Sequence, residues 1–171
     1  QGPGLMSFKG GTAVKLLFRQ RIFSWFDSYD IYDENGSTVF VVKGQLAWGH
    51  CLKICDPQGH ELGLVKEKII TFLPKFELYE GGRYIGRISK KLSLFSPKFA
   101  IDFNGWKVDG NFLEWDYTIR DAQDNWIATI GKELFHLSDT YVLDIGNPAD
   151  ALHVLMFALA MDAEKCSREK K

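Results

Sequence analysis

The histidines and cysteines of this sequence are the first candidates for catalysis, and they do not combine into a catalytic set. His50 is followed directly by Cys51. Neighbouring residues on a strand point to opposite faces, so this pair lacks the geometry of a base that activates a nucleophile. His136 and Asp139 could form a local pair, for which we do not predict a catalytic role.

The acidic residues offer one further candidate. Glu114 and Asp116 share a face of a predicted strand and would lie ~7 Å apart. Glycosidase carboxylates are separated by similar distances, but paired exposed carboxylates are also common on sheets. The glycine-rich turns do not open a helix as phosphate-binding loops do, and the cysteines show no zinc pattern. We therefore predict that the protein is not an enzyme and uses no metal and no cofactor.

Basic residues are concentrated between positions 66 and 98, where eight Lys or Arg residues accompany three Glu residues. Consecutive hairpins are usually neighbours in space, so these residues could form one patch. Lys90 and Lys91 point to opposite faces of a regular strand, so at least one of them should lie outside the patch. The predicted ligand-binding residues are Lys66, Lys68, Lys75, Arg83, Arg87, Lys91 and Lys98.

One long helix is predicted near the end of the sequence, over residues 147–164. Asn147 is a good N-cap, and Pro148 suits the first helical position. Between Ala151 and Met161 only His153 is polar. A helix that is apolar all round is buried or spans a membrane, and eleven residues reach only ~17 Å, short of a ~30 Å hydrocarbon core. We expect protein to enclose this helix, with His153 as a core or rim residue rather than a ligand.

The remainder of the sequence indicates short strands joined by regularly spaced turns. Gly36, Gly59, Gly82 and Gly105 follow one another at intervals of 23 residues, and Asp124-Asn125 continues the series 20 residues on. A similar strand follows each turn, which indicates a hairpin unit repeated about five times. With the first strand and residues 140–145, the total is about twelve strands.

Strand number and helix character together favour one architecture. A barrel of ~8 strands can be filled by its own side chains, whereas twelve strands leave a wider lumen. The apolar helix is a suitable occupant. We therefore predict a mainly β fold, a closed antiparallel barrel of about twelve strands around a central C-terminal hydrophobic helix. Closure would also remove exposed sheet edges.

Length and composition indicate a single globular domain. Gln1-Gly2-Pro3 matches the junction of a viral 3C-type protease site. Residues 1–14 are therefore predicted to be an expression scar or a flexible arm. The barrel domain is predicted over residues 15–164, and residues 165–171 are predicted to be a charged tail.

Cysteine use and charge bear on the compartment and the partners. Cys51 and Cys55 would lie ~13 Å apart on a strand, too far for a disulfide. With Cys166 they give an odd count, which predicts reduced thiols and the cytoplasm. No secretory signal and no transmembrane segment are predicted. The net charge of −1 argues against strong non-specific binding of nucleic acid.

From about Lys15 to Glu164 the sequence resembles the LURP-one-related family, which has the fold of the tubby C-terminal domain, and its length is similar to that of the bacterial single-domain members. The segments that carry the resemblance are Phe18-Arg19-Gln20-Arg21, Tyr32-Asp33-Glu34-Asn35-Gly36, Lys43-Gly44, residues 71–79 with Leu73-Pro74-Lys75-Phe76, residues 95–102 with Ser96-Pro97-Lys98-Phe99, and Gly105-Trp106-Lys107-Val108-Asp109-Gly110. The resemblance implies a twelve-stranded barrel around a central helix and little about activity. Relatives by fold include phosphoinositide-binding tubby proteins and phospholipid scramblases, but no phosphoinositide motif allows binding residues to be carried over.

The resemblance and the basic window lead to one main hypothesis. We expect a non-enzymatic binding module, located in the cytoplasm and peripherally at the membrane, that recognises anionic phospholipid headgroups or another anionic ligand on the barrel exterior. The simpler interpretation of the basic window is a solvated face balanced by acids elsewhere. The alternative function is a protein-interaction scaffold, and nucleic-acid binding ranks below both. The sequence predicts no oligomeric state.

Overall fold

The structure is a computed structural model that describes residues 12–19, 28–45, 47–94, 98–112, 114–133 and 140–169. These residues form twelve strands followed by a short 3-10 turn and one helix. The elements are β1 (Val14–Arg19), β2 (Ser28–Asp33), β3 (Thr38–Gly44), β4 (Cys51–Cys55), β5 (Glu61–Lys68), β6 (Lys75–Glu80), β7 (Arg83–Lys91), β8 (Lys98–Asp102), β9 (Lys107–Asn111), β10 (Asp116–Arg120), β11 (Trp126–Glu133), β12 (Thr140–Ile145), η1 (Pro148–Asp150) and α1 (Ala151–Glu169).

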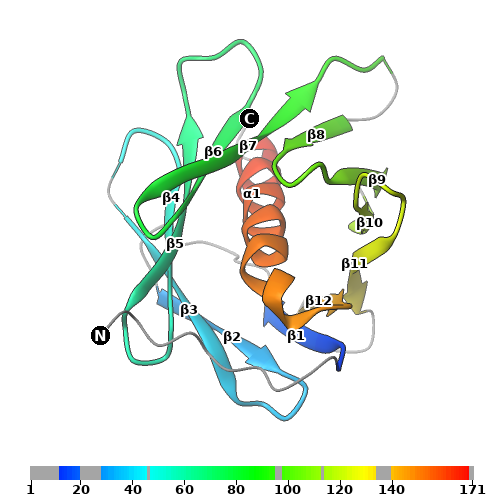
Figure 1. Cartoon of the computed structure of the whole chain (residues 1–171). Helices are drawn as coiled ribbons and strands as arrows, with labels where there is room; N and C mark the ends of the chain where they lie inside the picture. The colour runs from blue at the N-terminus through cyan, green and yellow to red at the C-terminus, as the bar shows by residue number, and fades with distance from the viewer. Residues whose placement is uncertain are drawn as a thin grey trace.

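All twelve strands belong to one antiparallel sheet, which wraps around α1 (Figure 1). The order across the sheet is β8-β7-β6-β5-β4-β3-β2-β1-β12-β11-β10-β9. Strands that follow one another in the chain are therefore neighbours, and β1 pairs with β12, from Val14 opposite Ile145 to Arg19 opposite Thr140. The predicted mainly β barrel around a C-terminal helix is confirmed.

The centre of the barrel is filled by the helix, as its apolar sequence predicts. From Val154 to Met161 no side chain is more than 1% exposed. The inward faces of the strands supply the surrounding layer because their apolar residues alternate with outward polar ones. On β5, Gly63 leaves space for the Met156 side chain, which a Cβ atom at that position would meet.

The two ends of the helix differ from the prediction in detail. Asn147 acts as the cap, and its Oδ1 accepts a hydrogen bond from Ala149 N at 3.0 Å, but the first turn is the 3-10 segment η1 rather than α-helix. At the other end α1 continues to Glu169, into the segment predicted to be a charged tail. Contacts with aromatic rings account for the extension: Lys165 Nζ lies 5.6 Å from the centre of the Trp115 ring, and Arg168 Cζ lies 5.4 Å from that of Phe112.

The barrel is nearly closed rather than closed. β8 and β9 stand at the two ends of the strand order, with no hydrogen-bonded ladder between them. The turn that joins them forms as predicted, with Trp106 N donating to Phe103 O at 3.0 Å, but the strands then separate. Across this seam the rings of Phe99 and Phe112 lie 5.0 Å apart, so aromatic packing takes the place of hydrogen bonding. The seam leaves two strand edges that complete closure would have removed.

The connections between strands gather at two opposite ends of the barrel. Alternate connections of an antiparallel meander lie at the same end. We call one end the turn rim; it carries the β2–β3, β4–β5, β6–β7, β8–β9 and β10–β11 turns and the start of α1. We call the opposite end the loop rim; it carries the β3–β4, β5–β6, β7–β8 and β9–β10 connections and the end of α1. Figure 1 shows the start of the helix with the β2–β3 hairpin at the lower end, and the β5–β6 and β7–β8 connections at the upper end.

Candidate functional site

Each histidine within the described residues, His50, His60 and His153, lies beside a carboxylate. His50 Nδ1 lies 2.5 Å from Glu67 Oε2. Burial alone would raise the pKa of Glu67, but hydrogen bonds from the His50 ring and amide outweigh burial and lower it. Burial raises the pKa of the Cys51 thiol, which opposes a role as a nucleophile.

The other sequence candidates also give no catalytic arrangement. His153 Nε2 lies 2.8 Å from Glu80 Oε2 at the turn rim, so this residue ties the helix to β6. His136 and Asp139 lie outside the described residues, and Glu114 and Asp116 are exposed. Among the described residues, no group of three or more His, Cys, Asp or Glu side chains could hold a metal ion.

The structure brings four of the seven predicted basic residues together at the loop-rim end of β5–β8. Lys68 stands directly opposite Lys75 across the β5–β6 ladder, and Lys91 stands directly opposite Lys98 across β7–β8. Lys75 is also opposite Ser89 on β7, so it is a diagonal neighbour of Lys91, ~8 Å away. We call Lys68, Lys75, Lys91 and Lys98 the lysine cluster.

The other three predicted residues are placed differently. Lys66 lies one outward row further from the loop rim, opposite Glu77. Arg87 is paired with Asp102, with Nε 3.4 Å from Oδ2. Arg83 begins β7 at the turn rim. Nine residues of β7, at ~3.3 Å each, place it roughly 26 Å from Lys91.

The neighbouring Lys90 and Lys91 point to opposite faces, as the alternation of a strand predicts. Lys90 points inward, and its Nζ lies 2.8 Å from Oε1 of Glu164, a side chain that is only 3% exposed. Glu164 Oε1 also lies 3.7 Å from Arg168 Nε. This buried group fastens the end of α1 to β7, whereas Lys91 remains on the exterior.

Most of the lysine cluster lacks an acidic partner. Lys68 Nζ lies 3.5 Å from Glu77 Oε1. Within the part of the chain that the structure describes, Lys75, Lys91 and Lys98 form no ion pair. Like charges directly opposite each other on a sheet are destabilising, and the cluster contains two such pairs. An anion placed among them would relieve this repulsion.

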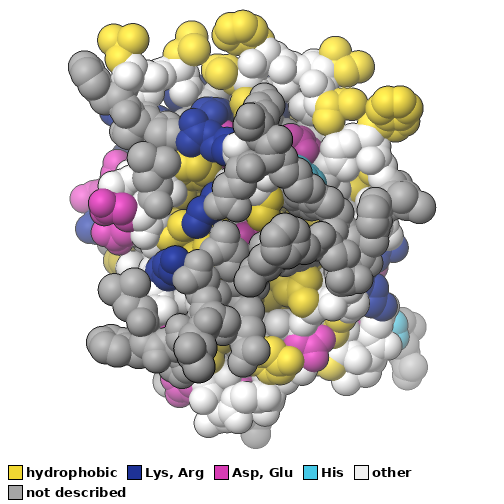
Figure 2. Space-filling model, turned by 180° about the vertical axis from the view of Figure 1, so that it is seen from behind, with side chains coloured by type: hydrophobic (Ala, Val, Ile, Leu, Met, Phe, Trp, Pro, Cys, Tyr) yellow, Lys and Arg dark blue, Asp and Glu magenta, His cyan; other side chains and the backbone are white. Residues whose placement is uncertain are grey.

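Beyond the lysine cluster, large apolar side chains project into solvent. Figure 2 shows separate hydrophobic groups along the end of the molecule that Figure 1 identifies as the loop rim. We call these residues the apolar crown; their exposed fractions are Trp48 87%, Ile69 48%, Ile70 95%, Phe72 93%, Leu92 78% and Leu94 94%. Monomeric soluble proteins rarely expose such groups together without an interaction that uses them.

From the sequence, the lysines are proposed as ligand-binding residues but the apolar crown is not, although the sequence contains a pattern that could have indicated it. The segment Lys68-Ile69-Ile70-Thr71-Phe72-Leu73-Pro74-Lys75 is an apolar run between two lysines. The segment from Lys91 to Lys98 repeats this pattern with Leu92 and Leu94. In each case the two bracketing lysines are register partners at the base of the loop.

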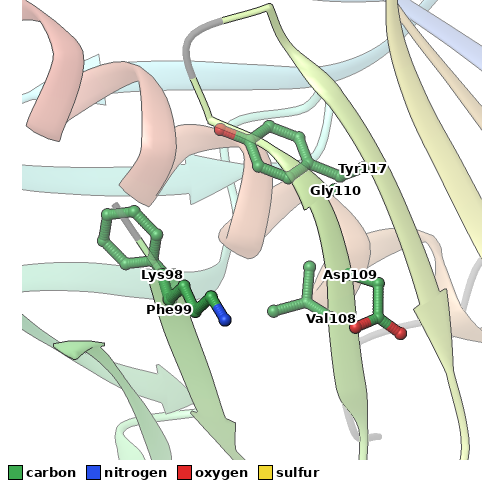
Figure 3. Close-up of a pocket in the computed structure, with 6 residues that line it drawn as sticks. All are labelled: Lys98, Phe99, Val108, Asp109, Gly110 and Tyr117. Atoms are coloured by element: carbon green, nitrogen blue, oxygen red, sulfur yellow. The ribbon is translucent and has the colours of Figure 1, made fainter. Parts of the chain in front are cut away.

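A small cleft opens at the seam between β8 and β9 (Figure 3). Its volume is about 130 Å³. The lining residues are Lys98, Phe99, Val108, Asp109, Gly110 and Tyr117. The Lys98 side chain extends across the seam toward β9, so this lysine belongs both to the cleft and to the lysine cluster. The described helix, α1, is not long and apolar enough to span a membrane.

Comparisons with known proteins agree with this architecture. The family model described as LURP-one-related matches residues 14–162. The uncharacterized protein YxjI of Bacillus subtilis (strain 168) is 28% identical over 150 residues, which cover 87% of this chain and 92% of that protein. The X-ray structure of a protein from Arabidopsis thaliana matches with a TM-score of 0.62 at 16% identity, over 90% of this chain and 93% of the other.

Proposed function

The chain belongs to the LURP-one-related family, and from that premise we propose that it is a non-enzymatic binding module whose lysine cluster recognises anionic phospholipid headgroups. The protein would act in the cytoplasm, peripherally at a membrane surface. The single observation that carries the proposal is that two Lys–Lys register pairs, Lys68 with Lys75 on the β5–β6 ladder and Lys91 with Lys98 on the β7–β8 ladder, lie on either side of the β6–β7 ladder.

The electrostatics of the cluster suit a phosphate-bearing surface. Each lysine near an anionic membrane contributes about 1 kcal/mol. Four lysines therefore supply on the order of 4 kcal/mol, which corresponds to a roughly thousandfold preference for an anionic surface. The overall charge of −1 supplies no such attraction, so binding would depend on the local arrangement.

Liposome co-sedimentation tests this proposal. Phosphatidylcholine vesicles are compared with vesicles that also contain about one third phosphatidylglycerol, at low and physiological salt. We expect selective binding to the anionic vesicles that weakens as salt screens the charges. The double variant Lys91→Glu with Lys98→Glu should reduce this binding by at least about tenfold.

Arg83→Glu is the matched control because Arg83 lies on β7 with Lys91 but at the opposite rim. This variant should bind anionic vesicles as the parent protein does. Failure of the parent protein to bind either kind of vesicle would contradict the proposal. Affinity capture of protein partners would then examine the scaffold alternative.

A further inference from the structure

We propose that the apolar crown enters the bilayer interface, so that the barrel stands on the membrane with its loop rim down and the end of α1 toward the lipid. This inference rests on the proposed recognition of anionic headgroups and adds an insertion surface and an orientation. The observation that supports it is that the exposed apolar side chains lie in loops whose two ends are paired lysines.

The β5–β6 and β7–β8 loops share one arrangement. Each loop begins and ends with a lysine, and the two lysines face each other across the last rung of the ladder. Neither the six residues between Lys68 and Lys75 nor the six between Lys91 and Lys98 include Asp or Glu. Two separate loops thus combine a pair of lysines at the base with exposed apolar side chains, Ile70 and Phe72 in one and Leu92 and Leu94 in the other.

The dimensions of the loops fit this arrangement. Ile70 is two residues beyond Lys68, which places its backbone at most ~7 Å further out. Interfacial segments bury their apolar face ~5–10 Å into the boundary between headgroups and acyl chains. Lysine ammonium groups at the loop base would then lie at the level of the phosphates, which their flexible side chains can reach.

The exposure of the crown favours a bilayer over a protein partner. Ile70, Phe72 and Leu94, which are 93–95% exposed, touch little of their own protein. Ile70 and Phe72 project from the β5–β6 loop and Leu94 from the β7–β8 loop, each almost fully exposed, whereas the core of a protein interface is a packed and continuous patch. A fluid lipid phase accepts separate projections without complementary pockets. The lysines at the loop bases add the charge complementarity that an anionic bilayer requires.

The β3–β4 loop extends the crown and supplies a reporter. His50 O accepts a hydrogen bond from Glu67 N at 2.7 Å, and Gly49 is so close to Ile69 that a Cβ would lie 2.6 Å from its Cγ2. These contacts hold the backbone that follows Trp48 against the end of β5 and the start of the β5–β6 loop. Indole rings favour the membrane–water interface, and Trp48 is 87% exposed.

The test measures insertion separately from charge recognition. Trp48 emission is recorded with anionic vesicles whose acyl chains carry bromine, and the Trp48→Phe variant gives the background from the other tryptophans. We expect quenching and a blue shift that the variant lacks. In parallel, a triple variant, Ile70→Ser with Phe72→Ser and Leu94→Ser, should lose at least about tenfold in binding to anionic vesicles at physiological salt.

Tyr84→Ser is the matched control because Tyr84 is 52% exposed at the turn-rim end of β7. It should bind vesicles as the parent does, and the triple variant should keep the parental thermal midpoint. If the triple variant binds normally and Trp48 is not quenched, while Lys91→Glu with Lys98→Glu abolishes binding, the insertion inference is overturned and headgroup recognition stands. If no vesicle binds the parent protein, both are overturned.

Discussion

The two rims of the barrel are built on different principles. At the turn rim, short polar turns satisfy their own backbone: Asp33 Oδ1 accepts hydrogen bonds from Asn35 N at 2.9 Å and from Ser37 N at 2.8 Å. Asp121 does the same for Gln123 and Asn125. At the loop rim, apolar tips project from pairs of lysines. The turn rim therefore specifies the fold, whereas the crown contributes little to folding and is available for an interaction.

The largest expected effect comes from the helix that both rims surround. Leu155→Asp places an unpaired charge at a site with no exposure, so we expect the protein to lose its cooperative fold. Circular dichroism during thermal unfolding measures this. Leu94→Asp, at a crown position that is 94% exposed, is the control and should fold normally. A Leu155→Asp protein that unfolded cooperatively would show that the helix interior tolerates charge.

The adjacent residues Lys90 and Lys91 are expected to contribute to different properties, Lys90 to stability and Lys91 to membrane binding. Lys90→Ala leaves the buried Glu164 without its 2.8 Å partner, which should cost about 3 kcal/mol of unfolding free energy. Lys91→Ala should change that free energy by less than about 0.5 kcal/mol and weaken binding to anionic vesicles instead. Urea unfolding and co-sedimentation of both variants measure the two quantities. Equal loss of stability in both variants would contradict the division of roles.

A smaller effect is expected from the turn rim itself. Asp33→Ala removes the acceptor of two backbone amides, so we expect a loss of about 1 kcal/mol in unfolding free energy. Ile70→Ser at the loop rim should change it by less than about 0.5 kcal/mol. Urea denaturation of the two variants measures the difference. The rims would not differ in their contribution to folding if Ile70→Ser were the more destabilising change.

The smallest effect is a dependence of stability on pH at the turn rim. Hydrogen bonds from the Asn125 side chain and from backbone amides lower the pKa of Asp121 below its usual value. A carboxyl whose pKa is lowered by folding stabilises the protein above its unfolded pKa, ~3.9. That contribution is lost as the pH falls through the folded pKa. Thermal midpoints between pH 6 and pH 2, roughly the span of carboxyl titration, should fall less steeply for Asp121→Asn than for the parent. An identical slope would refute the assignment.

The sequence predicted the structure of the turn rim more completely than that of the loop rim. The glycine spacing predicted the turns because positive φ angles at Gly36 and Gly59, 80° and 92°, are a local requirement that residue type reveals. The apolar run of α1 predicted burial on every side. The crown was missed because an apolar run such as residues 69–73 has the same composition whether it is buried or projects into water. Exposure is decided by the ladders that end at Lys68 and Lys75.

The seam and the end of the helix could not be predicted for a related reason. The turn at Asn104 and Gly105 is local and was foreseen, but the separation of β8 from β9 reflects how twelve strands fit around α1 and how Phe99 packs on Phe112. The helical extension to Glu169 depends on aromatic rings far away in the sequence. The four residues of the lysine cluster are brought together by the register of the strands. The alternation of apolar and polar residues in the sequence does not by itself fix that register.

The position of α1 after all twelve strands also affects how the protein folds during its synthesis. Strands β1 to β12 leave the ribosome before the helix that fills the space between them, and β1 meets β12 only after the intervening chain has been made. Contacts of such long sequence separation form slowly. Until α1 has been released, the inward faces of the strands have no core to cover, so the nascent chain depends on its local hairpins, and on any chaperone present, to avoid aggregation.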